Sequence, residues 1–359
     1  SHWFAMTYVE NKSVIEYKIV TRGKPFRNRA NDTAGKPVRH EPLRSRLTQN
    51  QVYQGGIIMN HTYYPEGMFP AALQAGEMSR EHLKKAYLEG TILEGTARSA
   101  TAAHDLIVDL GDVQGLIPRE ETAIGISDGS VRDIAILSRV GKPVSFLITS
   151  IDHLYDLRPA VTLSRRAAQQ EALDHLLYQE PTGTVLPAVV THLDRFGAFC
   201  DIGCGNVSLL SIEHISVSRI NHSRDRFSEG QHIFVAIASR DLHLRRLSLT
   251  HKELLGTWRE NAAQFSVGET VVGIVRSVKD YGVFIELSPN LSGLAEYRSD
   301  LQPGDRVSVF IKAILPDRQK VKLIVIRTLP REKSIPPIRY FQTSGTVSNW
   351  RYAGEMAMA

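Results

Sequence analysis

Two stretches of the chain share one pattern of apolar and polar positions. Residues 183–203 contain a β-branched run, a short polar break and a second apolar run that a glycine closes. Residues 273–288 repeat this order, with Tyr-Gly-Val-Phe at 281–284 where the first copy has Phe-Gly-Ala-Phe at 196–199. β-Branched and aromatic residues at this spacing predict two short consecutive strands in each copy.

A fainter third copy lies at residues 95–118, which keep the glycines and the apolar runs. A repeat of roughly 80 residues is long enough to be a small domain rather than a solenoid unit. Five short strands in each such repeat fit a small closed barrel of the OB type. We therefore predict a mainly β chain with three tandem five-stranded barrels, joined by short helices and preceded by a poorly structured basic arm.

Helical patterns separate the predicted barrels. Residues 79–90 and 164–178 each begin with a serine that can cap a helix. Thr250 and Glu253 match a capping box, which predicts a third helix from that point. The predicted domains are an N-terminal arm at 1–78, a degenerate barrel at 79–166, a linker helix at 167–180, a barrel at 181–249, a linker helix at 250–264, a barrel at 265–328 and a C-terminal tail at 329–359.

The two ends of the chain are read from composition. Residues 18–46 hold nine basic residues against two acidic ones, so this arm is either a solvated flexible segment or a contact for RNA phosphate. The rings between Tyr53 and Phe69 predict that part of the arm is ordered. The tail is too aromatic for a purely disordered segment, so we expect it to dock on a neighbouring part of the protein or to pair with an N-terminal strand.

The aromatic residues of the repeats are the first candidates for a binding surface. Phe196 and Phe199 flank a Gly-Ala pair, and their spacing breaks the strict alternation of a strand. At least one of these rings is therefore predicted to lie outside the core, unless Gly197 marks a bulge. Phe196 and Tyr281 each precede a glycine and are the rings most expected to be exposed.

The second copy resembles the S1 RNA-binding domain, which is named for bacterial ribosomal protein S1. The resemblance is carried by Phe196-Gly-Ala-Phe199-Cys-Asp201-Ile, by Ser208-Leu-Leu-Ser-Ile and by Asp241 ahead of Arg245-Arg246-Leu-Ser-Leu249. It covers roughly residues 91–328. Three tandem copies with little else are similar to the shorter S1-like proteins of Gram-positive bacteria.

The resemblance implies an RNA face made of two aromatics on the second strand, a His on the third, and an Asp and an Arg near the start of the fifth. The His position holds Ser211 in the second copy and Glu296 in the third, and the Arg position of the third copy holds Gln319. The residues that the resemblance assigns to RNA binding are Phe196, Phe199, Ser211, His214, Asp241, Arg245 and Arg246 in the second copy, and Tyr281, Phe284, Lys320 and Lys322 in the third.

The first copy departs from this pattern. Its aromatic positions hold His104 and Ile107, and its His position holds Pro118. The first copy has therefore lost the stacking surface, and we predict that it is a scaffold or a protein-docking domain.

Charge and cysteine content add limits to this picture. The 359 residues include 43 Lys and Arg against 38 Asp and Glu, and the formal net charge of +5 alone predicts no partner. Two cysteines, Cys200 and Cys204, are too few for a disulfide scaffold and suit a reducing cytoplasm. Apolar runs are far shorter than a membrane span, so no membrane partner is predicted.

No pattern predicts catalysis, a metal or a cofactor. Cys200 and Cys204 lack the further pair of ligands that a zinc site needs. Asp201 and Glu286 occupy the same place in two copies, so we interpret them as features of the barrels rather than as a catalytic pair.

The predicted function is non-catalytic binding of single-stranded RNA in the cytoplasm. The resemblance implies that the RNA is mRNA in translation and that the small ribosomal subunit is a partner. Two alternatives stay open. One is an accessory RNA-binding factor in RNA decay or transcription. The other is a protein-interaction module that has lost RNA binding, which Ser211, Glu296 and Gln319 favour.

Overall fold

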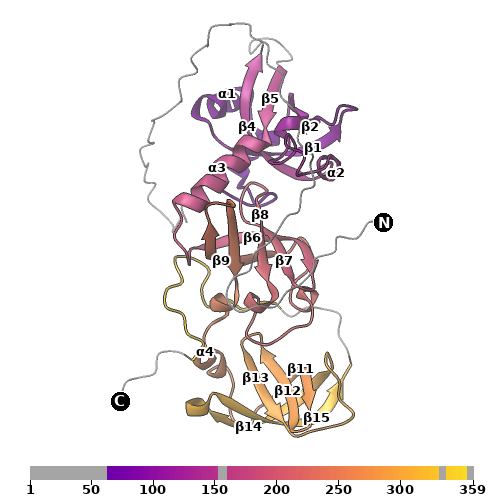
Figure 1. Cartoon of the computed structure of the whole chain (residues 1–359), viewed down its shortest axis with the longest axis vertical. Coiled ribbons are helices and arrows are strands. Elements are labelled where there is room, and N and C mark those ends of the chain that lie inside the picture. The colour runs from indigo at the N-terminus through magenta and orange to yellow at the C-terminus, as the bar shows by residue number, and fades with distance from the viewer. Residues whose placement is uncertain (1–62, 153–159, 331–336, 354–359) are drawn as a thin grey trace, which may run out of the picture. The chain divides into compact units, whose positions relative to one another are not determined.

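The computed structural model describes residues 63–152, 160–330 and 337–353. The predicted basic arm at 18–46 lies outside these ranges. Three closed five-stranded barrels confirm the predicted fold class (Figure 1). Within the described ranges, no helix is both long and apolar enough to cross a membrane.

Barrel 1 pairs its strands in the order β1-β2-β3-β5-β4. Its elements are α1 (Arg80–Glu89), β1 (Leu93–Ala100), β2 (Leu106–Asp109), β3 (Gln114–Ile117), α2 (Ile134–Leu137), β4 (Pro143–Asp152) and β5 (Ala160–Ser164), with 3₁₀ helices at Ala71–Leu73, Ala75–Glu77 and Arg119–Glu121.

Barrel 2 follows the helix α3 (Arg165–Tyr178) and has the strand order β10-β8-β7-β6-β9. Its elements are β6 (Val185–Asp194), β7 (Gly197–Asp201), β8 (Val207–Ser211), β9 (His232–Asp241) and β10 (Arg246–Thr250), with 3₁₀ helices at Ile212–His214 and Ser223–Asp225.

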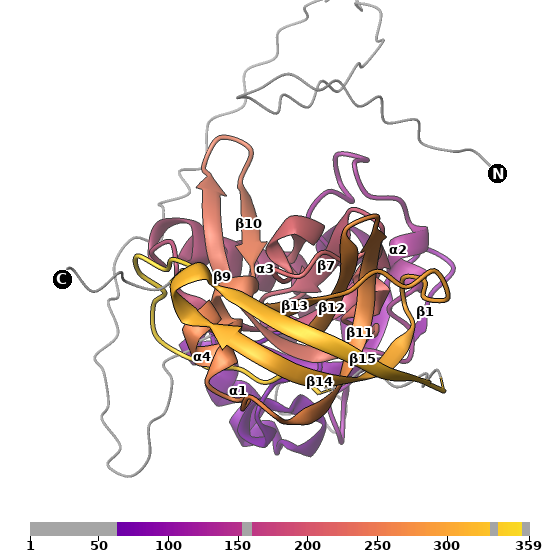
Figure 2. The same cartoon turned by 90° about the horizontal axis from the view of Figure 1, so that it is seen from below.

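Barrel 3 follows a 3₁₀ helix at Lys252–Leu255 and the short helix α4 (Trp258–Ala262), and its order is β11-β12-β13-β15-β14. Its elements are β11 (Thr270–Lys279), β12 (Gly282–Ser288), β13 (Leu291–Ala295), β14 (Arg306–Leu315), a 3₁₀ helix at Pro316–Arg318 and β15 (Lys320–Leu329). Figure 2 shows β14 and β15 as long neighbouring strands.

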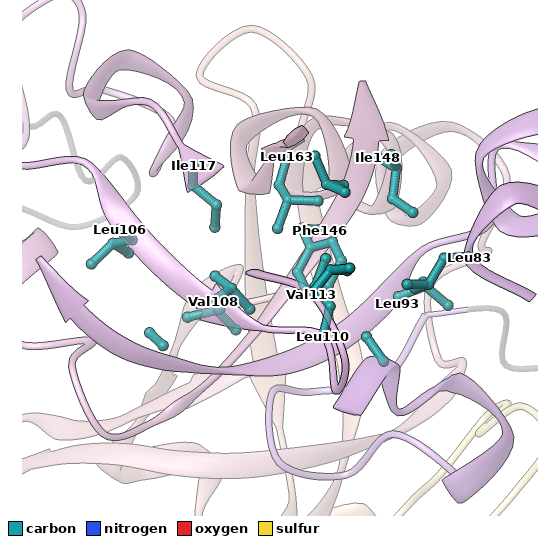
Figure 3. Close-up of a cluster of buried hydrophobic side chains, with 14 of the residues drawn as sticks. Leu83, Leu93, Leu106, Val108, Leu110, Val113, Ile117, Phe146, Ile148 and Leu163 are labelled. Carbon is teal, nitrogen blue, oxygen red and sulfur yellow. The ribbon is translucent and has the colours of Figure 1, made fainter. Parts of the chain in front are cut away.

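Each barrel encloses its own apolar core. Figure 3 shows the cluster inside barrel 1, where Leu110, Phe146 and Leu163 are completely buried. Phe146 comes from β4 and Leu163 from β5, and Leu110 directly follows β2, so the core draws on several strands of the barrel. Replacement of a buried Phe such as Phe146 by Ala typically lowers the stability of a protein by about 3–5 kcal/mol. The three cores therefore hold the strands, and with them the outward side chains, in place.

One bulge recurs at the same place in the first strand of every barrel. The pairing of β1 with β2 skips Arg98, that of β6 with β7 skips Thr191, and that of β11 with β12 skips Arg276. A bulge places two residues of one strand opposite one residue of its partner and increases the local twist. The three barrels are therefore equivalent position by position in these strands.

The predicted linker helices behave differently at the two junctions. Ser164 caps α3 by accepting a hydrogen bond from the backbone N–H of Ala167 at 2.9 Å, which confirms the predicted helix and its cap. The third predicted helix starts later than expected, because Thr250 ends β10 and Gly256 has a φ of 80° that interrupts the helix. The capping box is formed by Thr257 and Glu260 at the start of α4.

Two segments that the sequence assigned to the ends of the chain pack on the barrels. Phe69 and Ala75 are buried within the part of the predicted arm that the structure describes. In the tail, Tyr340 packs against Phe234 of β9 with ring centroids 5.3 Å apart, and the hydroxyl of Tyr352 donates to the carbonyl of Asn290 at 2.8 Å. The tail thus contacts both barrel 2 and barrel 3.

Candidate nucleic-acid interface

A row of outward side chains crosses four strands of barrel 2. His192 of β6 is opposite Phe199 of β7, Phe199 is opposite Leu209 of β8, and Leu209 is opposite Ser248 of β10. Side chains directly opposite one another lie on the same face of a sheet. Ala198 and Cys200, on either side of Phe199, are fully buried, so the face that carries Phe199 is the outer one. We call these four positions the outer row.

Two phenylalanines form the centre of this surface in barrel 2. Phe196 is 49% exposed and precedes β7, while Phe199 is half-buried. Their ring centroids are 5.8 Å apart and the planes are nearly perpendicular, at 88°. Both rings therefore lie outside the barrel core, and the bulge that the spacing suggested at Gly197 is at Thr191 of the neighbouring strand instead.

Close backbone approach explains the glycine that follows each exposed ring. A Cβ on Gly197 would lie 2.3 Å from the carbonyl oxygen of Leu210, and one on Gly282 would lie 2.6 Å from that of Ala295. Both glycines also have φ values, 158° and 152°, that side-chain-bearing residues rarely adopt. Only glycine lets the chain turn there, and that turn presents the preceding ring to solvent.

Barrel 3 has the same outer row with different residues. Ser277, Phe284, Leu294 and Lys322 are paired in succession across β11, β12, β13 and β15. Tyr281 is 70% exposed, and its ring centroid is 6.1 Å from that of Phe284 at a right angle. Barrel 3 therefore has one ring and an exposed lysine in its outer row, with a second ring, Tyr281, beside it.

Barrel 1 carries no ring in its outer row, which consists of Ser99, Ile107, Leu116 and Thr162. His104, at the position of Phe196, has its Nδ1 atom 3.1 Å from a carboxylate oxygen of Asp133. Arg119 donates to the other oxygen of Asp133 at 2.6 Å. The surface that holds aromatic residues in barrels 2 and 3 is aliphatic and ion-paired in barrel 1.

The polar residues predicted for barrel 2 lie at the ends of its strands. Ser211 is paired with Gly197, and the carbonyl oxygen of His214 accepts a hydrogen bond from the backbone N–H of His251 at 2.9 Å. Asp241 is exposed and accepts a hydrogen bond from the N–H of Leu244 at 2.8 Å, so it closes the turn between β9 and β10.

Two arginines at the start of β10 have different environments. Arg245 has a φ of 50° and donates to Asp174 of α3 at 2.5 Å. This contact occupies the side chain that the resemblance assigned to RNA. Arg246 is exposed, and its backbone lies opposite that of Asp241 in the pairing of β10 with β9.

The lysines predicted for barrel 3 are exposed on β15. Lys322 belongs to the outer row, and Lys320 is two residues before it on the same face. Gln319 has a φ of 49°, close to that of Arg245, so the two barrels turn into their last strands in the same way.

His192 is the aromatic residue of the outer row that sequence reasoning missed. Its imidazole lies 6.2 Å from the Phe199 ring, with the two planes inclined by only 30°. The bulge at Thr191 shifts the alternation of β6 by one residue, so counting along the strand does not place His192 opposite Phe199. The signal is visible only once the bulge is known.

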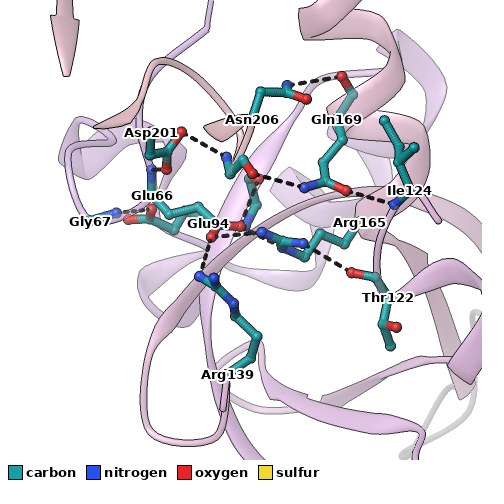
Figure 4. Close-up of polar contacts among 12 residues, drawn as sticks. Glu66, Gly67, Glu94, Thr122, Ile124, Arg139, Arg165, Gln169, Asp201 and Asn206 are labelled. Carbon is teal, nitrogen blue, oxygen red and sulfur yellow. Dashed lines mark hydrogen bonds and ion pairs between the residues drawn. The ribbon is translucent and has the colours of Figure 1, made fainter. Parts of the chain in front are cut away.

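Asp201 and Glu286 are structural and lie at the junctions between barrels. Asp201 accepts backbone hydrogen bonds from Glu66, Gly203 and Gly205 at 2.8, 2.9 and 3.0 Å (Figure 4). Burial and the charge of Glu66 raise the pKa of Asp201 to about 7. The backbone N–H groups favour the carboxylate and lower the pKa, but their effect is the smaller one.

Glu66 is itself paired with arginines. Its carboxylate accepts two hydrogen bonds from Arg165, at 2.6 and 2.9 Å, and one from Arg139 at 3.1 Å (Figure 4). Burial alone would raise the pKa of Glu66, but the arginines outweigh it and lower the pKa.

Glu286 has the corresponding place at the second junction. Arg226 of barrel 2 donates to both of its oxygens at 2.7 and 2.8 Å, and Arg276 donates to both at 2.7 and 3.1 Å. Burial alone would raise the pKa of Glu286, but these bonds hold it below its usual value. Among the described residues, no group of three or more His, Cys, Asp or Glu side chains could hold a metal ion.

Comparison with known proteins gives this geometry a context. Residues 179–252 match the model of the S1 RNA binding domain. The matched segment contains all five strands of barrel 2 and its outer row. The predicted resemblance to this domain is therefore confirmed.

The chain is also similar to the small ribosomal subunit protein bS1. It is 30% identical to that of Staphylococcus aureus (strain COL) over 243 residues, which cover 63% of this chain and 59% of the relative. It is 31% identical to that of Leuconostoc lactis over 234 residues, which cover 61% of this chain and 52% of the relative. The match thus spans little more than half the length of these relatives.

Among solved structures, similarity extends to a multidomain protein with nucleic acid binding domains from Streptococcus pneumoniae TIGR4. It is 12% identical, and the match covers 66% of this chain and 74% of that protein with a TM-score of 0.23. GSP13 from Bacillus subtilis is 21% identical over 24% of this chain and 74% of its own length, with a TM-score of 0.21.

Proposed function

We propose that the chain binds single-stranded RNA, with the bases lying on the outer rows of barrels 2 and 3. The observation that carries this proposal is the pair of solvent-exposed rings at equivalent positions, Phe196 and Tyr281, each beside a second ring. Rings exposed in this way offer flat faces to unpaired bases, at about 1–3 kcal/mol per stacked base.

Positive charge near these rings supports the same ligand. Arg195 precedes Phe196, Lys279 is two residues before Tyr281, and Lys322 is in the outer row of barrel 3; all three are exposed. Cations beside a stacking surface neutralise the phosphates between stacked bases, and the affinity then falls steeply with salt. Stacking is tolerant of base identity, so we expect little sequence preference.

The similarity to bS1 leads us to propose mRNA as the RNA and the small ribosomal subunit as a partner, in the cytoplasm. No catalytic step and no cofactor enter this proposal. The test is co-sedimentation of the protein with purified small subunits, with and without mRNA. Sedimentation with an RNA-degrading complex but not with the subunit would favour the alternative role in RNA decay.

Barrel 1 has a different role in this proposal. Its outer row lacks rings, and His104 is engaged by Asp133, so we propose that barrel 1 is a scaffold or docks another protein. Replacement of Ile107 by Ala is expected to leave RNA affinity unchanged.

The direct test of the RNA proposal is the double variant Phe196→Ala, Tyr281→Ala. We expect it to bind a short unstructured RNA about 2–6 kcal/mol more weakly if both rings stack. The measurement is filter binding at two salt concentrations. The control is Tyr178→Ala, which removes a ring that is 57% exposed at the end of α3. Equal affinity of the double variant and the wild type would refute the proposal and favour a protein-interaction module.

A further inference from the structure

The bulge in β6 aims His192 at the outer surface. Val190 is opposite Cys200 and His192 is opposite Phe199, so Thr191 is the extra residue between them. The hydroxyl of Thr191 donates to the carbonyl oxygen of Phe199 at 3.0 Å. This bond fixes the bulge to β7, and it thereby fixes the side of the strand from which His192 projects.

The imidazole of His192 is contacted at its edge, and its side chain is more than half exposed. Its Nδ1 atom lies 3.3 Å from a carboxylate oxygen of Glu229, in the loop before β9. The side chains of His192 and Glu229 are 58% and 53% exposed. The ring plane is inclined by 30° to that of Phe199, whereas Phe196 is nearly perpendicular to Phe199 on the same surface. His192 therefore extends the flat surface of Phe199 across β6.

The equivalent residue differs among the three barrels. Ser99 is opposite Ile107 in barrel 1, and Ser277 is opposite Phe284 in barrel 3. The surface around the outer row therefore has no stacking pair in barrel 1, two rings in barrel 3 and three in barrel 2. Barrels 2 and 3 both carry a ring on the second strand and another just before it. The residue of the first strand, His192 or Ser277, therefore decides whether the surface has a third ring.

We propose that His192 is a third stacking residue, which gives barrel 2 contact with one more unpaired base than barrel 3. This inference rests on the proposed RNA binding and adds to it a residue that sets how the two barrels differ. Barrel 2 is then the tighter site and takes the longer run of unpaired nucleotides. Glu229 is a positioning residue that holds the imidazole edge and leaves its face to the base.

The test uses the full chain and a short unstructured RNA in a binding titration. His192→Ser gives barrel 2 the residue that barrel 3 has, and we expect it to bind about fivefold or more weakly, because one stacked base contributes about 1–3 kcal/mol. His192→Phe keeps a ring and is expected to retain the wild-type affinity. If His192 had only a structural role, the Phe variant would not keep the wild-type RNA affinity while the Ser variant lost it.

The converse change builds the third ring on barrel 3. Ser277→His is expected to strengthen binding in a chain whose barrel 2 surface has been weakened by Phe196→Ala. The matched control is His232→Ser, which removes an exposed histidine of β9 opposite Val189, outside the outer row. It should leave the affinity unchanged.

Two failures are distinguishable. If Phe196→Ala weakens binding while His192→Ser does not, RNA stacking stands and the role of His192 is overturned. If neither change alters the affinity, the proposed RNA binding itself is overturned. If both His192→Ser and His192→Phe lose RNA affinity, the stacking role is also overturned, because the loss would indicate a contact specific to the imidazole nitrogens.

Discussion

Buried charged residues at the junctions between barrels form ion pairs. Their burial decides how much stability the protein loses when one of them is removed. Arg226 and Glu286 are both nearly inaccessible and form a two-bond pair, whereas Arg298 and Asp300 form a similar pair at the surface. Removal of Arg226 would take two charge-assisted hydrogen bonds from the buried Glu286 and leave it with those of Arg276, while exposed pairs contribute little.

The first prediction at this scale is that Arg226→Ala destabilises the protein by about 2–4 kcal/mol, because Glu286 loses two hydrogen bonds but keeps those of Arg276. Arg298→Ala is the control and should cost less than about 1 kcal/mol. Urea unfolding measures the loss of stability, and hydrogen exchange of the backbone amides of β12 shows whether the loss is at this junction. Equal effects of the two changes would show that the junction does not depend on this pair.

Acid should weaken the same junction. The folded-state pKa of Glu286 is depressed, so the stability that its charge contributes is present above the unfolded-state pKa and is lost as pH falls through the folded value. We predict that the wild type loses stability below about pH 4 at this junction. Glu286→Gln should be less stable than the wild type at neutral pH, and the difference should shrink in acid. Unfolding midpoints measured across this range would reveal a constant difference if the prediction were wrong.

Sequence reasoning at the residue scale reached the rings but not their neighbours. Phe196 and Tyr281 were identifiable because each lies directly before a glycine and three residues before a second ring, a spacing that breaks strand alternation. His192 was not, because its position depends on the bulge at Thr191, and no residue type specifies that bulge. The ion pair of Arg245 with Asp174 was also hidden, since it joins segments 71 residues apart.

At the scale of elements, the tail docks through one buried imidazole. His251 Nδ1 lies 2.7 Å from the carbonyl oxygen of Ile215, so this nitrogen carries the proton and donates. Its Nε2 atom lies 3.1 Å from the hydroxyl of Tyr340, which therefore donates to it. The same hydroxyl accepts from the backbone N–H of Phe234 at 3.2 Å. This pattern of bonds fits a neutral histidine, which is the form that burial favours.

Acidification should loosen the tail. Burial lowers the pKa of His251 to about 4, so between that value and the unfolded value near 6.5 the unfolded state binds more protons. Stability therefore falls as pH falls through this window, by up to about 3 kcal/mol. His251→Gln should flatten the dependence. Unfolding midpoints of both proteins between pH 7 and pH 5 would test this, and parallel curves would contradict it.

The tail ring itself should matter more than an exposed one. Tyr340→Ala removes packing against Phe234 and His251 and both hydrogen bonds, and we expect a loss of about 2–4 kcal/mol. Tyr178→Ala, at an exposed ring, should cost less than about 1 kcal/mol. Thermal unfolding distinguishes the two, and an equal response would show that the tail contact adds no stability.

Strands and helix caps were largely predictable from the sequence, since alternation and a serine cap are local signals. The helix after β10 was not, because its start depends on a tertiary contact. A Cβ on Gly256 would lie 2.7 Å from the ring of Phe341, so the glycine makes room for a tail residue far along the chain. Thr250 and Glu253 do meet through their side chains, but without an α-helix.

At the scale of the whole molecule, the three barrels share one fold and differ in their outer rows. Barrel 1 has Ile107, barrel 2 has Phe199 beside His192, and barrel 3 has Phe284 beside Ser277. The same scaffold therefore presents surfaces with different numbers of aromatic rings. The number of barrels followed from the repeats in the sequence, whereas the contacts at their junctions required the structure.

We expect RNA to lie on the rings of barrels 2 and 3 and not on barrel 1. Ultraviolet crosslinking of a short photoreactive RNA to the full chain, followed by mass spectrometry of the linked peptides, tests this most directly. We predict crosslinks at residues 192–199 and 281–284. Crosslinks confined to residues 104–107, or to segments away from all three outer rows, would contradict it.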